Sequence, residues 1–158
     1  MANKEATVMV LDVGRTMWHS LDVDGKTHLD NACTAIAHIL HSKITQGRKT
    51  DLVAIVLVGT DGTKNALNEK IKTQYKHITT YVDIGMASLD TFKYVTNGCE
   101  KGSGSGDIID GIVVAITMLE KHCKHLKWVK SIFVFSDFST EIDTDDDNKI
   151  ISKAVDYG

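Results

Sequence analysis

Four short apolar segments, separated by longer segments with helical periodicity, constrain the fold of this chain more than any other feature. They lie at residues 7–11, 52–58, 78–82 and 131–135, and each is rich in valine, isoleucine or aromatic residues. Nearly continuous apolar runs of this length are typical of strands that are covered on both faces, as they are in parallel sheets. The pattern therefore predicts an α/β fold: a doubly wound, mostly parallel sheet with helices on both faces.

Helix signals lie between most of these runs. The strongest helix begins near Leu29, where apolar residues recur at spacings of three and four, and Thr27 with Asp30 forms a capping-box pattern just before it. Gly47 marks the end of this helix, because glycine readily adopts the left-handed conformation that terminates helices. Three further helices are expected, at about residues 89–95, 107–126 and 148–155.

The composition of the chain is that of a soluble, globular protein. Its 158 residues are 42% hydrophobic and 25% charged, which suits one domain spanning residues 1–158. The polar N-terminus and the lack of a long apolar stretch indicate an intracellular protein without a membrane partner. A crossover helix normally returns to the sheet in α/β folds, so the helical segment that ends the chain indicates a C-terminally truncated fragment of a longer protein.

Charge and cysteine content limit the possible functions. The net charge of −3 argues against nucleic-acid binding by this chain alone, because phosphate backbones are bound mainly by clustered lysine and arginine. Cys33, Cys99 and Cys123 are an odd number at wide spacings. This arrangement favours reduced and mostly buried thiols over a disulfide framework or a zinc motif.

Oxygen-bearing side chains gather where ligands bind in doubly wound sheets, beyond the carboxyl ends of the strands. Asp12 and Thr16 follow the first strand, Asp107 precedes a helix, and Ser136 with Asp137 follows the last strand. Such oxygens could coordinate Mg²⁺. Each residue also has a structural interpretation, because carboxylates and hydroxyls at these positions accept hydrogen bonds from loop amides or cap helices. Spacing alone does not decide between the two.

The segment after the first apolar run has a third interpretation, as a phosphate-binding loop. DVGRT at residues 12–16 resembles the first phosphate motif of the actin and sugar-kinase ATPase superfamily, and GTDGT at residues 59–63 offers consecutive amides that could form a second such loop. Residues 19–29 could supply the hairpin that follows, with Asp-Gly at its turn. Against this alternative, the helix after Thr27 leaves little chain for that family's sheet, and neither a catalytic base nor an adenosine-binding segment is evident.

Four motifs occur in an order that resembles one known family. ATVMVLDVGRTM, VLVGTDGTKNAL, GDIIDGIVVAITML and IFVFSDFS are together similar to the N-terminal von Willebrand factor A-type domain of the larger, eighty-kilodalton subunit of Ku, a DNA-end-binding heterodimer. GTDGTKN is the most specific part, because generic A-type domains and the smaller Ku subunit lack it at that place. GRKTDL, at the start of the second apolar run, is similar to the fungal members.

The resemblance also carries an expectation about metal binding. The family's metal motif is Asp-x-Ser-x-Ser, followed by a threonine in a second loop and an aspartate in a third. Here Gly14 replaces the first serine, and Gly106 with Asp107 stands where the threonine is expected. The resemblance therefore implies a structural role and no cofactor, with Mg²⁺ as the alternative. The retained positions of this degenerate metal site are Asp12, Thr16 and Asp137.

The resemblance further implies a non-enzymatic protein-interaction domain in the nucleus. Ku starts non-homologous end joining and, in fungi, also acts at telomeres; DNA is bound by the full-length heterodimer with the smaller Ku subunit. The A-type domain recruits end-joining and telomere factors through short peptide motifs, and residues 148–155 are the implied surface for a telomeric silencing protein. The implied peptide-binding residues are Leu67, Tyr75, Asp107, Asp110 and Val113.

Other interpretations stay open at this point. An apolar groove edged by carboxylates would suit a peptide with an aromatic anchor and basic residues. Leu67 and Val113 also fit plain core packing, since both lie in apolar patterns. The alternative functions are an actin-like or sugar-kinase-like ATPase that uses residues 12–16 and 59–63, and a metal-dependent ligand-binding A-type domain.

Overall fold

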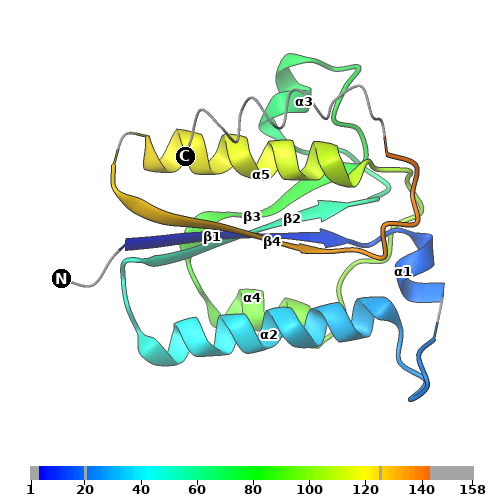
Figure 1. Ribbon diagram of the computed structural model, residues 1–158, viewed down its shortest axis with the longest axis horizontal. Helices are drawn as coiled ribbons and strands as arrows, with labels where there is room; N and C mark the ends of the chain where they lie inside the picture. Colours follow the sequence, from blue (N-terminus) through cyan, green and yellow to red (C-terminus); the bar gives the residue numbers. More distant parts are fainter. Residues whose placement is uncertain (1–3, 20, 125, 143–158) are drawn as a thin grey trace.

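A four-stranded sheet forms the middle layer of the fold (Figure 1). Its strands are β1 (Lys4–Asp12), β2 (Asp51–Val58), β3 (Ile78–Met86) and β4 (Trp128–Phe135). The computed structural model describes residues 4–19, 21–124 and 126–142. Within it the strand order is β3-β2-β1-β4, with β1 parallel to both β2 and β4 and β3 antiparallel to β2. The predicted mostly parallel sheet is confirmed, and every predicted strand is longer than its apolar run.

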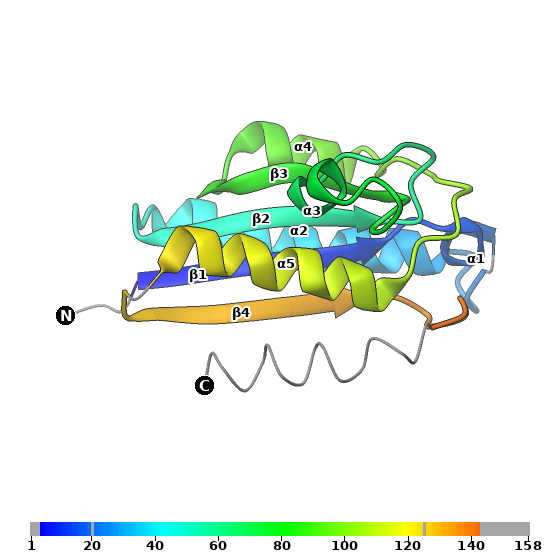
Figure 2. The same cartoon turned by 90° about the horizontal axis from the view of Figure 1, so that it is seen from above.

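Helices cover both faces of this sheet, as Figures 1 and 2 show. On one face lie α2 (His28–Gln46) and α4 (Leu89–Thr96), and on the other lies α5 (Ile108–Cys123). Two short helices, α1 (Arg15–His19) and α3 (Ala66–Lys70), follow β1 and β2 along the chain. The predicted covering of both faces is confirmed, whereas the helix expected at residues 148–155 lies outside the described residues. None of these helices is long and apolar enough to cross a bilayer.

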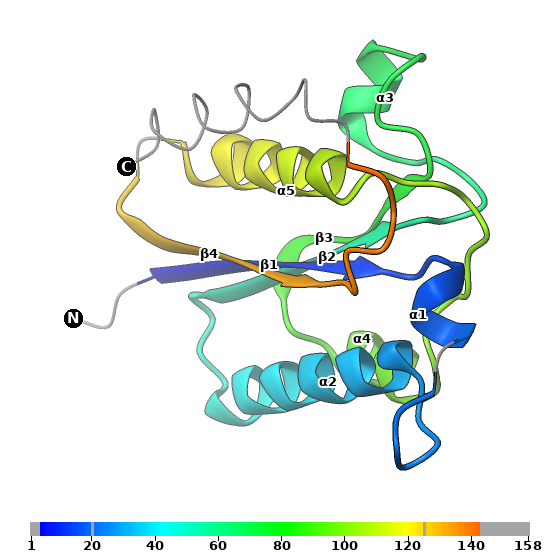
Figure 3. The same cartoon turned by 45° about the vertical axis from the view of Figure 1, so that its right-hand side comes forward.

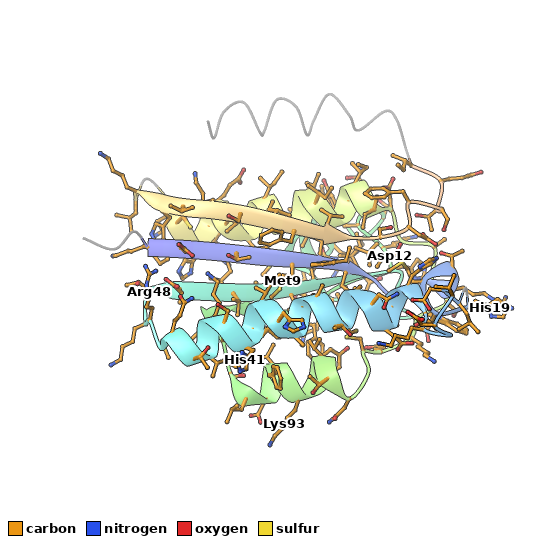
Figure 4. The ribbon with its side chains drawn as sticks, turned by 60° about the horizontal axis from the view of Figure 1, so that its bottom comes forward. Met9, Asp12, His19, His41, Arg48 and Lys93 are labelled. Carbon is orange, nitrogen blue, oxygen red and sulfur yellow. The ribbon has the colours of Figure 1, made fainter. Side chains whose placement is uncertain are left out.

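Two apolar cores follow from the alternation of side chains along the central strands. Met9 and Leu11 of β1 belong to the core beneath α2, together with Ile36 (Figure 4). Val8 and Val10 belong to the core beneath α5. All five side chains are fully buried. Because successive residues enter different cores, β1 has to be apolar at every position from Val8 to Leu11, and this explains the continuous apolar run in that part of the strand.

The ends of α2 lie where the sequence predicted them. Thr27 Oγ1 accepts a hydrogen bond from the Asp30 amide at 3.0 Å, and Asp30 Oδ2 accepts one from the Thr27 amide at 2.9 Å. This is a complete capping box, which satisfies two amides that the helix itself leaves unpaired. At the other end Gly47 adopts φ 61° and its amide bonds to the carbonyls of Lys43 and Ile44, so the left-handed glycine cap is confirmed as well.

The antiparallel direction of β3 places the β2–β3 connection at one edge of the sheet. Val58, at the end of β2, pairs with Ile78, at the start of β3. The intervening residues 59–77 therefore stay at the carboxyl edge and carry α3 there, instead of crossing the sheet as a parallel connection would. As a result, the loops after β1 and β2, the start of α5 and the loop after β4 share one edge (Figure 3).

Candidate functional site

The loops after β1 and β4 are joined through the buried carboxylate of Asp12. Its Oδ1 accepts a hydrogen bond from the Gly14 amide at 2.8 Å, and its Oδ2 accepts one from Ser136 Oγ, also at 2.8 Å. Asp12 is only 2% exposed, and Figure 4 shows it at the end of β1 beside α1. The sequence predicted that these two loops meet, and the Asp12–Ser136 contact confirms it.

A second contact between the same loops involves hydroxyl groups. Ser139 Oγ lies 2.7 Å from Thr16 Oγ1 and 2.7 Å from Asp137 Oδ1. The Ser139 amide also donates to Asp137 Oδ1 at 3.1 Å. The three predicted metal-site residues Asp12, Thr16 and Asp137 are therefore brought to one place by contacts with Ser136 and Ser139.

The two carboxylates of this cluster have opposite electrostatic environments. Burial raises the pKa of Asp12 above its ordinary value, and the hydrogen bonds from Gly14 and Ser136 only partly oppose this effect. Burial on its own would also raise the pKa of Asp137, but the hydrogen bonds from Ser139 and Thr16 outweigh it and leave that pKa lower than usual. The ionised form of Asp12 is thus less favourable in the folded state than that of Asp137.

The possible metal ligands at this edge are engaged in hydrogen bonds within the protein. Gly14 brings no hydroxyl, and a Cβ at that position would lie 3.0 Å from Asp12 Oδ1. Both oxygens of Asp12 are already occupied by hydrogen-bond donors. Asp107 caps α5, where its side chain accepts from the Ile109 amide at 2.7 Å. Across the described residues, no three histidine, cysteine or acidic side chains come together as a metal-binding group. The arrangement suits a loop frame held by hydrogen bonds.

The glycine-rich segment before α5 packs against the first two loops. The Gly102 amide donates to the Val13 carbonyl at 2.9 Å, and the Gly104 amide donates to the Gly59 carbonyl at 3.1 Å. A Cβ on Gly102 or Gly104 would collide with the backbone of the loop after β2. Gly102 and Gly104 are therefore required by this close backbone approach, and the segment that leads to the predicted site residue Asp107 reaches the shared edge.

The first two amides of the GTDGT segment are engaged in hydrogen bonds within the protein. The amides of Gly59 and Thr60 both donate to the His77 carbonyl, at 2.8 and 3.1 Å. Asp61 Oδ1 accepts from the amide and the hydroxyl of Ser103, at 2.8 and 2.7 Å. A phosphate nest needs several unpaired amides that point at one spot, and the amides of Gly59 and Thr60 are not available to one. Of the hairpin that this alternative predicted at residues 19–29, the described residues show one isolated antiparallel bridge, between Leu21 and Thr27.

The predicted peptide-binding residues surround α3 and α5. Leu67 on α3 lines a groove of about 470 Å³ between α3, β3 and α5. Tyr75, in the loop after α3, packs with Leu67 against the apolar core beneath α5. Asp107 is the N-cap of α5 and Asp110 lies in its first turn. Val113, on the same helix, is 4% exposed, so the core-packing interpretation holds for this side chain.

One contact connects the Tyr75 loop to the start of α5. A Cβ on Gly106 would lie 2.9 Å from the His77 carbonyl oxygen, so the residue before the α5 cap touches the backbone two residues after Tyr75. Asn65 strengthens this arrangement, because its side-chain amide donates to the carbonyls of Tyr75 and Ile78 at 3.0 and 2.9 Å. Of the five predicted peptide-binding residues, only Leu67 lines the groove itself. The carboxylates that line it are Glu69 and Asp83, whereas Asp107 and Asp110 lie at the N-terminal end of α5.

Comparison with known proteins agrees with this geometry. A family model described as the Ku70/Ku80 N-terminal alpha/beta domain matches residues 6–157. The chain belongs to this Ku family. It is 37% identical to X-ray repair cross-complementing protein 5 of Dictyostelium discoideum, over 90% of the chain and 18% of that protein. It is also similar to ATP-dependent DNA helicase II subunit 2 of Yarrowia lipolytica (35%, 97% of the chain, 22% of that protein) and of Coccidioides immitis (31%, 100% and 22%).

These relatives place the chain with the larger Ku subunit, as the sequence motifs predicted. The chain spans about a fifth of the length of the curated relatives that it matches. The predicted von Willebrand A-like fold is confirmed for this Ku domain by the family match and by the mostly parallel sheet.

Several residues of the groove between α3, β3 and α5 were not predicted. Tyr81 and Ile84 of β3 line it, together with Val114 and Met118 of α5. Their role depends on the antiparallel placement of β3 at the sheet edge, and no local pattern in the sequence shows that direction. A usable signal was the helical spacing of four between Val114 and Met118, which puts both side chains on one face of α5.

Proposed function

We propose that this chain is a non-enzymatic protein-interaction domain of the nuclear Ku complex. It recruits end-joining and telomere factors by binding short peptide motifs in the groove that Leu67 lines. The observation that carries the proposal is the position of Leu67: it is half-buried, belongs to an open groove and stands on a helix that is separate from the central sheet. The family match supports the assignment to Ku and its role in DNA repair.

The groove defines the chemistry of the peptide. Leu67, Ile84 and Met118 offer an apolar surface to an aromatic or aliphatic anchor. Asp107 and Asp110 stand at the N-terminal end of α5, outside the lining of the groove, and would pair with basic residues of a ligand that extends there. The groove itself carries charges of both signs, from Glu69 and Asp83 and from Lys64 and Lys121. A bound peptide therefore orients its basic residues towards the start of α5 and keeps acidic residues away from that end.

The remaining partners follow from the family. The smaller Ku subunit completes the heterodimer, and DNA is bound only by the full-length assembly, which agrees with a net charge of −3 on this chain. The telomeric silencing partner is assigned to residues 148–155, outside the described residues. No nucleotide or metal cofactor takes part: the amides of Gly59 and Thr60 donate to His77, and the oxygens of Asp12 accept protein donors.

A peptide titration tests this function. A fluorescent basic peptide with an aromatic anchor is titrated with the wild-type chain and with Leu67→Glu, and anisotropy is recorded. A charge in the apolar wall of the groove should weaken binding by about thirtyfold or more, the effect of losing a hot-spot contact of about 2 kcal/mol.

Leu89→Glu is the matched control, since Leu89 lies on α4, away from the groove, and is 63% exposed. It makes the same chemical change and should leave the affinity within about twofold. Circular dichroism verifies that both variants fold. Equal affinity of wild type and Leu67→Glu, or an equal loss in both variants, would contradict the proposed site.

A further inference from the structure

Two thiols from distant parts of the chain are in direct contact. Cys33 Sγ, on α2, lies 2.9 Å from Cys99 Sγ, in the segment after α4. Both side chains are buried, and all three cysteines of the chain are free thiols, as the sequence predicted. A disulfide requires a sulfur–sulfur distance of about 2.05 Å, so a shift of less than about 1 Å would bring the two sulfurs to bonding distance.

A small oxidant can reach this pair from outside. Cys33 lines a groove of about 650 Å³ between α2 and α4, whose walls also include Ala37, Val95 and Gly98. His41 and Phe92 face each other across it, with ring centroids 6.5 Å apart, and Figure 4 shows His41 on the side of α2 next to α4. The groove is distinct from the one that Leu67 lines, because it lies on the opposite face of the sheet.

The two sulfurs are chemically unequal. The hydrogen bond from Cys99 lowers the pKa of the Cys33 thiol, against the opposing effect of burial. The same contact, together with burial, raises the pKa of the Cys99 thiol. Since the thiolate is the nucleophile in thiol oxidation, Cys33 reacts first and Cys99 remains the protonated neighbour.

We propose that Cys33 and Cys99 are a reversible peroxide-oxidation site of this domain. The Cys33 thiol attacks hydrogen peroxide, forms a sulfenic acid and releases one water molecule. The Cys99 thiol then attacks the sulfenic sulfur, forms the Cys33–Cys99 disulfide and releases a second water. Two thiols are oxidised and one peroxide is reduced to two waters, so atoms and electrons balance; a dithiol reductant reverses the reaction.

The disulfide would tie α2 to the connection between α4 and α5. That connection continues into Gly102, whose amide donates to the Val13 carbonyl and whose carbonyl accepts from Trp18 Nε1 at 3.1 Å. Oxidation therefore links a helix beneath the sheet to the loop frame at its carboxyl edge. This link is a property of the fold and does not depend on the proposed peptide function.

Peptide mapping of the full-length native protein tests the site without any substitution. Trypsin separates the three cysteines, because Cys33 falls in residues 27–43, Cys99 in residues 94–101 and Cys123 in residues 122–124. The protein is treated with hydrogen peroxide, blocked with iodoacetamide under denaturing conditions and digested. We expect a 27–43/94–101 cross-linked species that is lost on reduction, equal losses of alkylated Cys33 and Cys99, and unchanged alkylation of Cys123.

Two variants separate the roles of the sulfurs. In Cys99→Ala, Cys33 should accumulate as a sulfenic acid that dimedone labels, whereas in Cys33→Ala the oxidation of Cys99 should be lost. Cys123 is the internal control, as burial raises the pKa of its thiol and it sits at the end of α5. The proposal is overturned if peroxide oxidises Cys33 to the sulfinic acid while Cys99 stays alkylatable, or if Cys99 reacts equally well in Cys33→Ala.

Discussion

Replacement of Asp12 separates a hydrogen-bonded loop frame from a metal site. In Asp12→Ala the buried Gly14 amide and the Ser136 hydroxyl lose their acceptors. In Asp12→Asn both contacts can persist, because the amide oxygen accepts from Gly14 and the amide nitrogen donates to Ser136 Oγ. The two variants remove the same charge but differ in the hydrogen bonds that they leave.

The magnitude follows from the burial of these groups. A buried amide left without an acceptor costs about 1–3 kcal/mol, and the half-buried Ser136 hydroxyl, which can turn to water, costs about 0.5–1 kcal/mol. Removing the buried charge of Asp12 offsets part of this loss of stability, because the folded protein no longer has to bury a carboxylate. We therefore expect Asp12→Ala to lower the free energy of unfolding by about 2–3 kcal/mol, and Asp12→Asn to change it by less than about 1 kcal/mol.

The pH dependence gives an independent check. Burial raises the pKa of Asp12 in the folded state, so the folded protein holds this proton more tightly than the unfolded chain does. The contribution of Asp12 to stability is then greatest below the ordinary aspartate pKa of about 3.9 and falls as the pH rises through the raised pKa. Relative to wild type, Asp12→Asn should become more stable from acid to neutral pH.

Urea unfolding monitored by tryptophan fluorescence at several pH values measures both effects. The reasoning is refuted if Asp12→Asn is as destabilised as Asp12→Ala at neutral pH. It is refuted equally if the stability of wild type relative to Asp12→Asn rises with pH, since a carboxylate that is stabilised as an anion would behave in that way.

Two further predictions concern packing and ligands. Gly111→Ala places a methyl group against Val58 and 3.2 Å from Val10 Cγ1, and should lower the free energy of unfolding in urea by about 1–2 kcal/mol. In Gly62→Ala, where a Cβ meets no atom within 4 Å, the free energy of unfolding should change by no more than about 0.5 kcal/mol. Similar losses in both variants would contradict the packing argument. In a thermal-shift assay, millimolar ATP or Mg²⁺ should leave the melting temperature unchanged, because a ligand raises it only by preferring the folded state; an ATP-dependent rise would favour the ATPase alternative, and a rise with Mg²⁺ alone would favour a working metal site.

Local sequence signals predicted the parts of this fold that depend on neighbouring residues. Thr27 and Asp30 form the predicted capping box, and they lie within one helical turn of each other. Gly47 forms the predicted glycine cap directly after the last residue of α2. The continuous apolar run of β1 follows from its two covered faces. Asp107 was predicted as a possible helix cap, and it is one.

Features that depend on distant residues could not be predicted. The direction of β3 is set by its pairing with β2, and α1 and α3 have five residues each, too few for an amphipathic period. The contact between Cys33 and Cys99 joins positions 66 residues apart. Ser139 was not identified as a partner of Thr16, because their contact spans 123 residues.

Hydrogen–deuterium exchange with and without the basic, aromatic-anchored peptide tests the central claim most directly. One groove lies between α3, β3 and α5, and another lies between α2 and α4 on the other face of the sheet, so the location of protection decides between them. The proposed function predicts slower exchange in residues 65–75 and 107–118 on peptide binding. Protection confined to residues 30–41 and 92–98, or no protection at a saturating peptide concentration, would contradict it.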